Sequence, residues 1–457
     1  MPLGLRLVAL GFWGGLGLIA GSLPTAPARA QPATGQEIEV ATNTEGALDL
    51  ARKALSAGRP DLAVSIARQI LASDPENTAA HMLLAAALTR SGHAPEAMAA
   101  AKAGFRLSDS PEDHFEAAYL AAEAASLAGR PMAAKLWLRW ADTYAPTERH
   151  AAVIERAYSS VSAQSRLSFG LSVFGGPSDN VNGGSLHDTF WFYGLPIPIT
   201  QAIPGQVLGG AVQASYRVSD SLQLWLGWTH QEVILGAEAR GLDPDVRAQD
   251  FRRDEVRLGF AKDWQNAAGT SGLQLELSTG RRWQGGDVSA DISEAGLMAR
   301  HLLGETWAIG AKLHLEDVAY ADRPSADSLT GRLTFSTSHM NARFGATTLE
   351  IGVADVASNA AGIAWRGPVA KLGWKPVLPT DWVAVKVDLS VEQRDYWRTP
   401  DFEPDLAIGA AVTADLPKLG VMGFDPSVTV SSSRTRSQVV VRDQQEVAIS
   451  FGFSSKF

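Results

Sequence analysis

The chain has 457 residues, with 40 Lys and Arg against 49 Asp and Glu, and its formal net charge is -9. An acidic chain without a basic stripe argues against nucleic acid as a partner. Cysteine is absent, which excludes disulfides, thiolate metal sites, a cysteine nucleophile and lipid attachment at a cysteine. After residue 30, no apolar run approaches the roughly 18 residues that a membrane-spanning helix needs.

The first 30 residues have the features of an export signal. Arg6 provides a positive charge, residues 7–20 are apolar, and residues 28–30 (Ala-Arg-Ala) form a small-x-small cleavage site. We predict a signal peptide over 1–30 and a linker over 31–44. The alternative is an uncleaved amino-terminal anchor, which the shortness of the apolar run disfavours.

Residues 45–163 are rich in alanine and have a recurring frame. Gly58, Gly92 and Gly129 are each followed by small or apolar residues five, nine and twelve positions later, and the glycines lie 34 and 37 residues apart. Such a glycine closes the turn between two helices, and small residues let the helices approach. A helical repeat of 34 residues resembles the tetratricopeptide repeat (TPR). We therefore predict a TPR-like domain over 45–163, with an unrelated alanine-rich helical bundle as the alternative.

The third repeat departs from the 34-residue spacing. Ser110 followed by Pro111 and two acidic residues is typical of a helix N-cap and first turn. This pattern predicts a three-residue insertion before the first helix of that repeat. Residues 144–163 are expected to supply a capping helix, because terminal repeats need a polar outer face.

From residue 164 onward, the apolar pattern changes from period 3.6 to period 2, and ten of the 13 tryptophans lie in this half. About fourteen alternating segments begin near residues 166, 207, 222, 250, 272, 290, 306, 328, 341, 358, 381, 403, 425 and 444. Their connections alternate between tight links, as around Gly304 and Ser338, and long ones, as over 176–206 and 316–327. Such alternation predicts a transmembrane antiparallel β-barrel of about 14 strands over 164–457. The fold class is thus α + β in two domains, and a soluble barrel or sandwich is the alternative for the second.

The carboxyl terminus favours the membrane barrel. Phe451, Phe453 and Phe457 share one face of the last segment with other apolar residues. A last strand of this kind resembles the signal read by the outer-membrane barrel assembly machinery, which we expect as a partner together with the outer-membrane lipid bilayer.

The sequence contains no recognisable catalytic motif. There is no Gly-x-Ser-x-Gly elbow, no His-Glu-x-x-His pair and no phosphate-binding glycine loop. Residues 179–184 are rich in oxygen donors, but Val181 occupies a position where a calcium loop needs a ligand. We expect no enzyme activity, no cofactor and no metal site.

Periplasmic repeats before a barrel of about fourteen strands resemble the Slam family, the surface lipoprotein assembly modulators. The local likeness lies where the repeats meet the barrel. Residues 166–172 resemble the family's first strand, and an Asp/Asn-rich segment follows, comprising Pro177, Ser178, Asp179, Asn180 and Asn182. We call residues 177–182 the junction motif. Ordinary turn chemistry is the alternative interpretation of these residue types.

The resemblance implies an outer-membrane protein whose periplasmic repeats dock a surface lipoprotein, or its periplasmic chaperone, and whose barrel helps it reach the cell surface. In the repeat frame, the first helices would line a concave groove with Glu45, Arg52, Met82, Thr89, Arg90, Glu116, Tyr119 and Glu123. The alternative is a polysaccharide-export or solute porin whose repeats bind a periplasmic partner.

Overall fold

The computed structural model describes residues 43–455, except 194, 243–245 and 400–402. The predicted signal peptide (1–30) and nearly all of the predicted linker (31–44) lie outside the described residues. Phe457, which belongs to the predicted assembly signal, also lies outside them.

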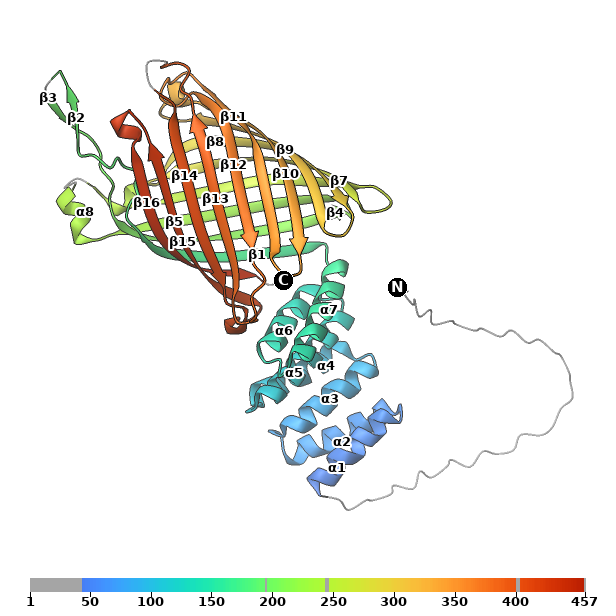
Figure 1. The fold of residues 1–457 in the computed structure, drawn as a ribbon. Helices are drawn as coiled ribbons and strands as arrows, with labels where there is room; N and C mark the ends of the chain where they lie inside the picture. The colour runs from blue at the N-terminus through green and yellow to red at the C-terminus, as the bar shows by residue number, and fades with distance from the viewer. Residues whose placement is uncertain (1–42, 194, 243–245, 400–402, 456–457) are drawn as a thin grey trace, which may run out of the picture. The chain divides into compact units, whose positions relative to one another are not determined.

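The amino-terminal part consists of helices stacked in pairs (Figure 1). They are α1 (Thr44–Ser56), α2 (Pro60–Ser73), α3 (Thr78–Arg90), α4 (Ala94–Leu107), α5 (Pro111–Leu127), α6 (Pro131–Thr143) and α7 (Glu148–Gln164). The three frame glycines have positive φ, between 66° and 79°, as the turns between paired helices require. The small residues that follow them, such as Ala63, Ala97 and Ala134, are fully buried between helices. The predicted helical repeats are confirmed.

The insertion in the third repeat lengthens its first helix. The Ser110 hydroxyl accepts a hydrogen bond from the Asp113 amide at 3.0 Å, and Pro111 occupies the first turn. As a result, α5 has 17 residues, whereas α1 and α3 have 13 each. Helix α7 follows the third pair at the position predicted for a capping helix.

The remaining chain forms a closed antiparallel barrel of fourteen strands. They are β1 (Leu167–Ser178), β4 (Gly205–Ser219), β5 (Leu222–Leu235), β6 (Arg253–Gln265), β7 (Ser271–Gln284), β8 (Asp287–Leu303), β9 (Trp307–Tyr320), β10 (Ser328–Asn341), β11 (Gly345–Ser358), β12 (Trp365–Lys375), β13 (Ala384–Arg394), β14 (Asp405–Asp415), β15 (Phe424–Arg436) and β16 (Gln444–Ser455). Neighbours in sequence are neighbours in the sheet, and β1 pairs with β16 to close it. We call this β1–β16 interface the seam.

Three details of the sequence prediction need correction. Ser338 lies within β10 instead of at a turn, and its hydroxyl is 2.9 Å from that of Thr348 on β11. Strand β9 continues to Tyr320, so the long connection expected from residue 316 is shorter. The connection after β1 contains a small hairpin, β2 (Thr189–Phe192) with β3 (Leu195–Pro198), and a short helix, α8 (Ala237–Leu242), follows β5.

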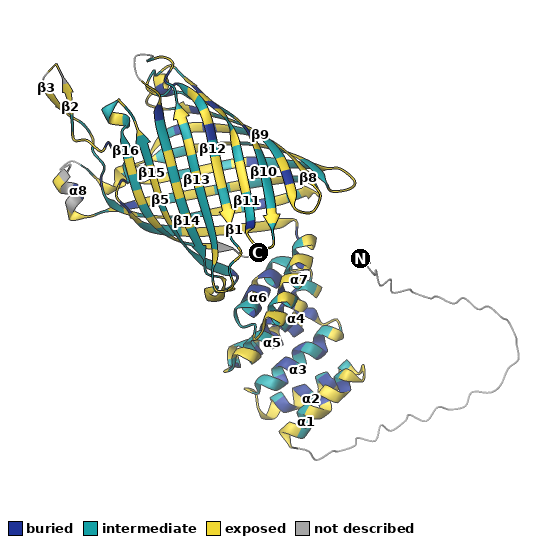
Figure 2. Ribbon diagram, viewed as in Figure 1, coloured by how far each residue is buried: buried dark blue, intermediate teal, exposed yellow. Residues whose placement is uncertain are grey.

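The barrel wall exposes large apolar side chains on alternate residues, as on β5, where Leu224, Leu226 and Trp228 are exposed. Exposed residues recur along the strands of the barrel in Figure 2. Alternation along each strand places the other residues toward the lumen. None of the described helices is long and apolar enough to cross a membrane. We call the end of the barrel where β1 begins the turn end, and the opposite end, which carries the connection between β1 and β4, the loop end.

Candidate functional site

The lumen wall carries a cluster of charges of both signs on β6 to β9. Val256 and Leu258 are exposed on the outer face, so Glu255 and Arg257 face inward. The Glu255 carboxylate accepts from Arg282 on β7 at 2.8 Å, and it also pairs with Arg253 and Arg257. Because one carboxylate serves three guanidinium groups, the cluster holds its arginines against the wall.

The same cluster extends to β8 and β9. Arg257 also pairs with Glu294, which lies directly opposite Glu316. The ligand atoms of Glu294, His314 and Glu316 lie within 4.8 Å of one another, so this trio could hold a metal ion. Two opposed carboxylates repel each other unless a cation or proton lies between them, and Arg257 already supplies positive charge at Glu294.

A second lumenal cluster joins β10 to β13. Arg332 donates to Glu392 at 2.9 Å, and Arg394 donates to the same carboxylate at 2.6 Å. Two strands lie between Arg332 and Glu392, and they present the small residues Ala354 and Gly367 at this level. Small residues on the intervening strands leave room for the long Arg332 side chain to cross. Charges of both signs therefore line the lumen.

The predicted groove residues come from three adjacent helices. Arg52 is exposed on α1, Arg90 on α3, and Glu116 and Glu123 on α5. Partial desolvation raises the pKa of the Glu116 carboxyl, Asp113 adds to this effect, and Arg52 opposes it. Desolvation likewise raises the pKa of Glu123, while Arg90 opposes that increase. Opposite charges from different repeats thus act on one another across this face.

The other predicted groove residues differ in their accessibility. Glu45 is exposed at the start of α1, and Tyr119 is half-buried, with its pKa raised by burial and by Glu123. Met82 is only 8% exposed and packs with residues of α4 and α5, so the structure places it in the core instead of on the groove. The Thr89 hydroxyl is buried and has no hydrogen-bond partner among the described residues.

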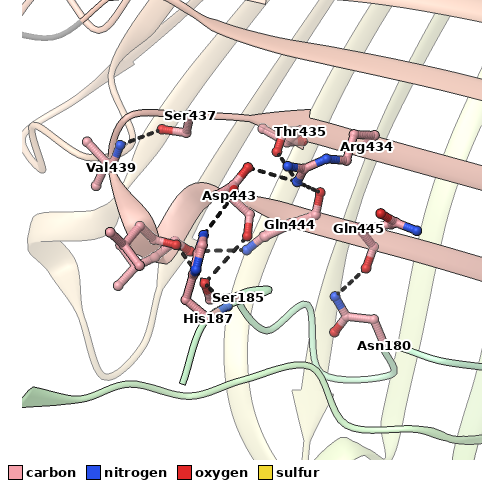
Figure 3. A network of polar contacts seen from close by, with 12 residues as sticks. Asn180, Ser185, His187, Arg434, Thr435, Ser437, Val439, Asp443, Gln444 and Gln445 are labelled. Atoms are coloured by element: carbon pink, nitrogen blue, oxygen red, sulfur yellow. Dashed lines mark hydrogen bonds and ion pairs between the residues drawn. The ribbon is translucent and has the colours of Figure 1, made fainter. Parts of the chain in front are cut away.

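The junction motif lies at the loop end, against the last strand of the barrel (Figure 3). The Ser178 hydroxyl donates to Glu446 at 2.8 Å, and the Asn180 amide donates to the Gln445 carbonyl at 2.9 Å. The Asp179 carboxylate accepts from the Val447 amide at 2.7 Å. Asn182 instead bonds within its own connection, to the backbone of residues 184, 201 and 203. The oxygen donors of the motif are thus engaged by protein groups. Pro177 is the next-to-last residue of β1 and precedes these contacts.

Two members of the predicted assembly signal lie on the outer barrel wall. Phe451 and Phe453 on β16 are 55% and 51% exposed. Their alternation matches the apolar face expected for a last strand. Recognition by the assembly machinery stays a prediction.

Comparison with known families matches part of the helical repeats. A family model for the tetratricopeptide repeat matches residues 54–106. No curated protein matches the chain. Among solved structures, a BenF-like porin from Pseudomonas fluorescens Pf-5 is similar, with 8% identity, a TM-score of 0.37, and coverage of 63% of this chain and 98% of that chain.

Two further solved structures are similar to parts of the chain. A bacterial polysaccharide outer membrane secretin has 8% identity and a TM-score of 0.34, and the match covers 63% of this chain and 98% of that chain. A KdgM porin has 11% identity and a TM-score of 0.26, and the match covers 44% of this chain and 96% of that chain. The closed order of fourteen antiparallel strands is itself that of an outer-membrane barrel.

Proposed function

We propose that this protein delivers lipoproteins to the cell surface. Its repeats dock the lipoprotein or its chaperone in the periplasm, and its barrel assists translocation across the outer membrane. Barrels of this type have short periplasmic turns and longer extracellular loops, so the turn end faces the periplasm. The repeats precede β1 and belong on that side.

The interaction of opposite charges between repeats is the observation that carries the proposal. Arg52 and Arg90 on two repeats act on Glu116 and Glu123 of the third. A repeat array that exposes charges of both signs on the predicted groove residues suits an extended or amphipathic peptide segment. Only two residues separate the end of α7 from the start of β1, so a docked segment is held close to the barrel.

The mixed charges on the lumen wall favour a polypeptide as the translocated substrate over a polymer that carries charge of one sign. Glu255 and Glu392 each pair with more than one arginine, and Lys386 pairs with Asp388 at 2.7 Å. A lumen wall with both positive and negative side chains can contact both the acidic and the basic residues of a polypeptide.

The test uses the native host with this gene deleted. Intact cells are treated with protease, and the released surface peptides are quantified against the parent strain. We expect one or a few lipoproteins to remain abundant but to become protected. Unchanged lipoprotein exposure, together with lower surface polysaccharide or lower solute uptake, would instead identify an exporter or a porin.

Complementation then tests the groove. We expect Arg90→Glu to restore barrel levels in the outer membrane without restoring lipoprotein exposure, because it reverses a groove charge. Lys102→Glu is the matched control, since Lys102 is an exposed cation on α4, outside the predicted groove. Equal rescue by both variants would remove the docking role from the repeats.

A further inference from the structure

The seam is the least paired interface of the barrel. Among the described residues, four registered pairs join β1 to β16, from Val173–Phe453 to Ser178–Ala448. The interface between β12 and β13 has six such pairs, and every other interface has at least ten. Cross-strand pairs are the unit of sheet stabilisation, so the barrel opens most easily here.

Side chains strengthen the loop-end half of the seam. Beyond the Ser178, Asp179 and Asn180 contacts, His187 lies 3.0 Å from the Asp443 carboxylate, which also pairs with Arg434 at 2.8 Å (Figure 3). The Ser185 hydroxyl donates to the Val440 carbonyl at 2.6 Å. We call this set of contacts, from residues 178–187 to residues 434–447, the loop-end lock. Ser178, Asn180 and Ser185 are at most 5% exposed, so their hydrogen bonds are shielded from water.

The turn-end half of the seam is different. Residues Leu167 to Ser172 of β1 pair with β4, but none pairs with β16 within the described residues. Strand β16 itself continues along β15 as far as Ser455. In an antiparallel sheet, alternate residues direct their amide and carbonyl groups toward each neighbour. This edge of β1 therefore presents backbone amide and carbonyl groups to which a membrane interior offers no hydrogen-bond partner.

On the side of β4, an arginine holds the segment that leads into β1. The Arg217 guanidinium on β4 donates to the carbonyl oxygens of Ser162 at 2.7 Å and Ser165 at 2.8 Å, which lie at the end of α7 and just before β1. The edge is thus fastened on its β4 side, whereas its other side has no registered partner among the described residues.

We propose that the β1 edge over residues 167–172 is a pairing site for an extended polypeptide strand, which enters the barrel wall between β1 and β16 at the turn end. The edge offers backbone hydrogen bonds, which a polypeptide strand satisfies. Leu167, Phe169 and Leu171 face outward and alternate with Ser168, Gly170 and Ser172, so the entering strand alternates apolar and small polar residues.

An entering strand also widens the seam. It needs about twice the 4.8 Å spacing of neighbouring strands, so the ladder opens from its Val173–Phe453 end while the loop-end lock acts as the hinge. This inference depends on the proposed function in one respect only, because the proposed function identifies the entering strand as part of the translocating polypeptide.

Hydrogen exchange on the purified full-length protein in detergent micelles tests the edge directly. We expect the β16-facing amides of residues 167–172 to exchange about tenfold faster than those of residues 173–178, because local opening controls exchange. A synthetic peptide copying residues 444–455 serves as the probe strand and should slow exchange at 167–172. A scrambled peptide without alternation should not. Equal protection of both halves, or no effect of the probe, overturns the proposal.

A reversible crosslink tests the seam in cells. The chain has no cysteine, so Val173→Cys with Phe453→Cys can join β1 to β16 without competing thiols. Val212→Cys with Trp228→Cys is the matched control on the fully paired β4 and β5, also on the outer face. We expect the oxidised seam crosslink to lower lipoprotein exposure to the level of the gene deletion, a reductant to restore it, and the control to match the parent.

The outcomes separate the two proposals. Parent-level exposure with an oxidised seam crosslink overturns strand entry while leaving lipoprotein delivery intact. Deletion of the gene without any change in lipoprotein exposure overturns the proposed function. In that case, the exchange measurement with the probe peptide alone decides whether β1 accepts a strand.

Discussion

Glu255 on β6 lies directly opposite Arg282 on β7, and the guanidinium donates to the carboxylate at 2.8 Å. The Glu255 side chain is 13% exposed and is also shared by Arg253 and Arg257. A shielded acceptor that serves three cations is the centre of the lumenal cluster. Its removal leaves all three arginines without their common partner.

We therefore expect Glu255→Gln to lower the free energy of unfolding by about 1.5–3 kcal/mol, the range for hydrogen bonds to charged groups. Urea titration followed by tryptophan fluorescence measures this change. Asp322→Asn is the control, because Asp322 and Arg323 form an exposed pair that should contribute almost nothing. Glu255→Gln combined with Arg282→Gln should recover part of the loss, and purely additive losses would contradict the cluster.

Asn180 and Asn182 provide a matched pair of asparagines in the junction motif. Asn180→Ala removes the bond to Gln445 and leaves the Gly184 carbonyl without its side-chain donor, at a cost of about 1–3 kcal/mol. We expect faster hydrogen exchange in residues 444–448 of this variant. Asn182→Ala should alter exchange near residues 201–203 and spare β16, since its bonds remain within one connection. The same exchange pattern in both variants would argue against a specific loop-end lock.

The loop-end lock should weaken in acid. Burial opposes ionisation of Asp443, but Arg434 and His187 outweigh it and hold the pKa of this carboxyl below its ordinary value of 3.8. A lowered pKa means that the carboxylate stabilises the fold fully above pH 3.8 and that this contribution is lost as the pH falls through the lower, folded value. Urea midpoints compared between pH 7 and pH 3 should fall less in Asp443→Asn than in the parent. An identical fall in both proteins would exclude Asp443 as a contributor.

Two glycines of the repeats should respond in opposite directions to alanine. Gly92 has a φ of +79°, which costs an L-residue about 1–2 kcal/mol, so Gly92→Ala should lower the melting temperature of the helices. Gly104 is helical, and an added Cβ would lie 3.4 Å from the Met82 side chain, so Gly104→Ala should be neutral or stabilising. Far-UV circular dichroism of the full chain measures both changes. A loss in both variants would indicate tight packing at Gly104.

The periodicity of the sequence was sufficient to predict both halves of the fold. Repeated glycines determine the helix turns, and two-residue alternation determines the strands, because each pattern depends on neighbouring residues alone. Strand limits were harder to predict where small polar residues such as Ser338 occur in strands as well as in turns. The start of β12 at Trp365, seven residues after its predicted position, shows the same ambiguity.

The candidate sites were less predictable because their contacts join distant positions. The inward carboxylates follow from alternation, but the pairing of Glu392 with Arg332 depends on barrel closure and on small residues in two intervening strands. Met82 fits the groove by its position in the frame, yet the approach of α4 at Gly104 buries it. The junction motif was recognisable as a pattern, while its partners on β16 lie about 265 residues later in the chain.

That separation in the sequence determines when, during synthesis, the junction motif can form its contacts with β16. Residues 178–187 leave the ribosome long before residues 434–447 exist, so their polar groups cannot find these partners on the nascent chain. Closing so long a loop carries a large entropic cost and a high contact order, both of which delay the step. Completion of the last strand is therefore the event that commits the barrel to closure, and a chain truncated before residue 444 would retain an edge that no other segment completes.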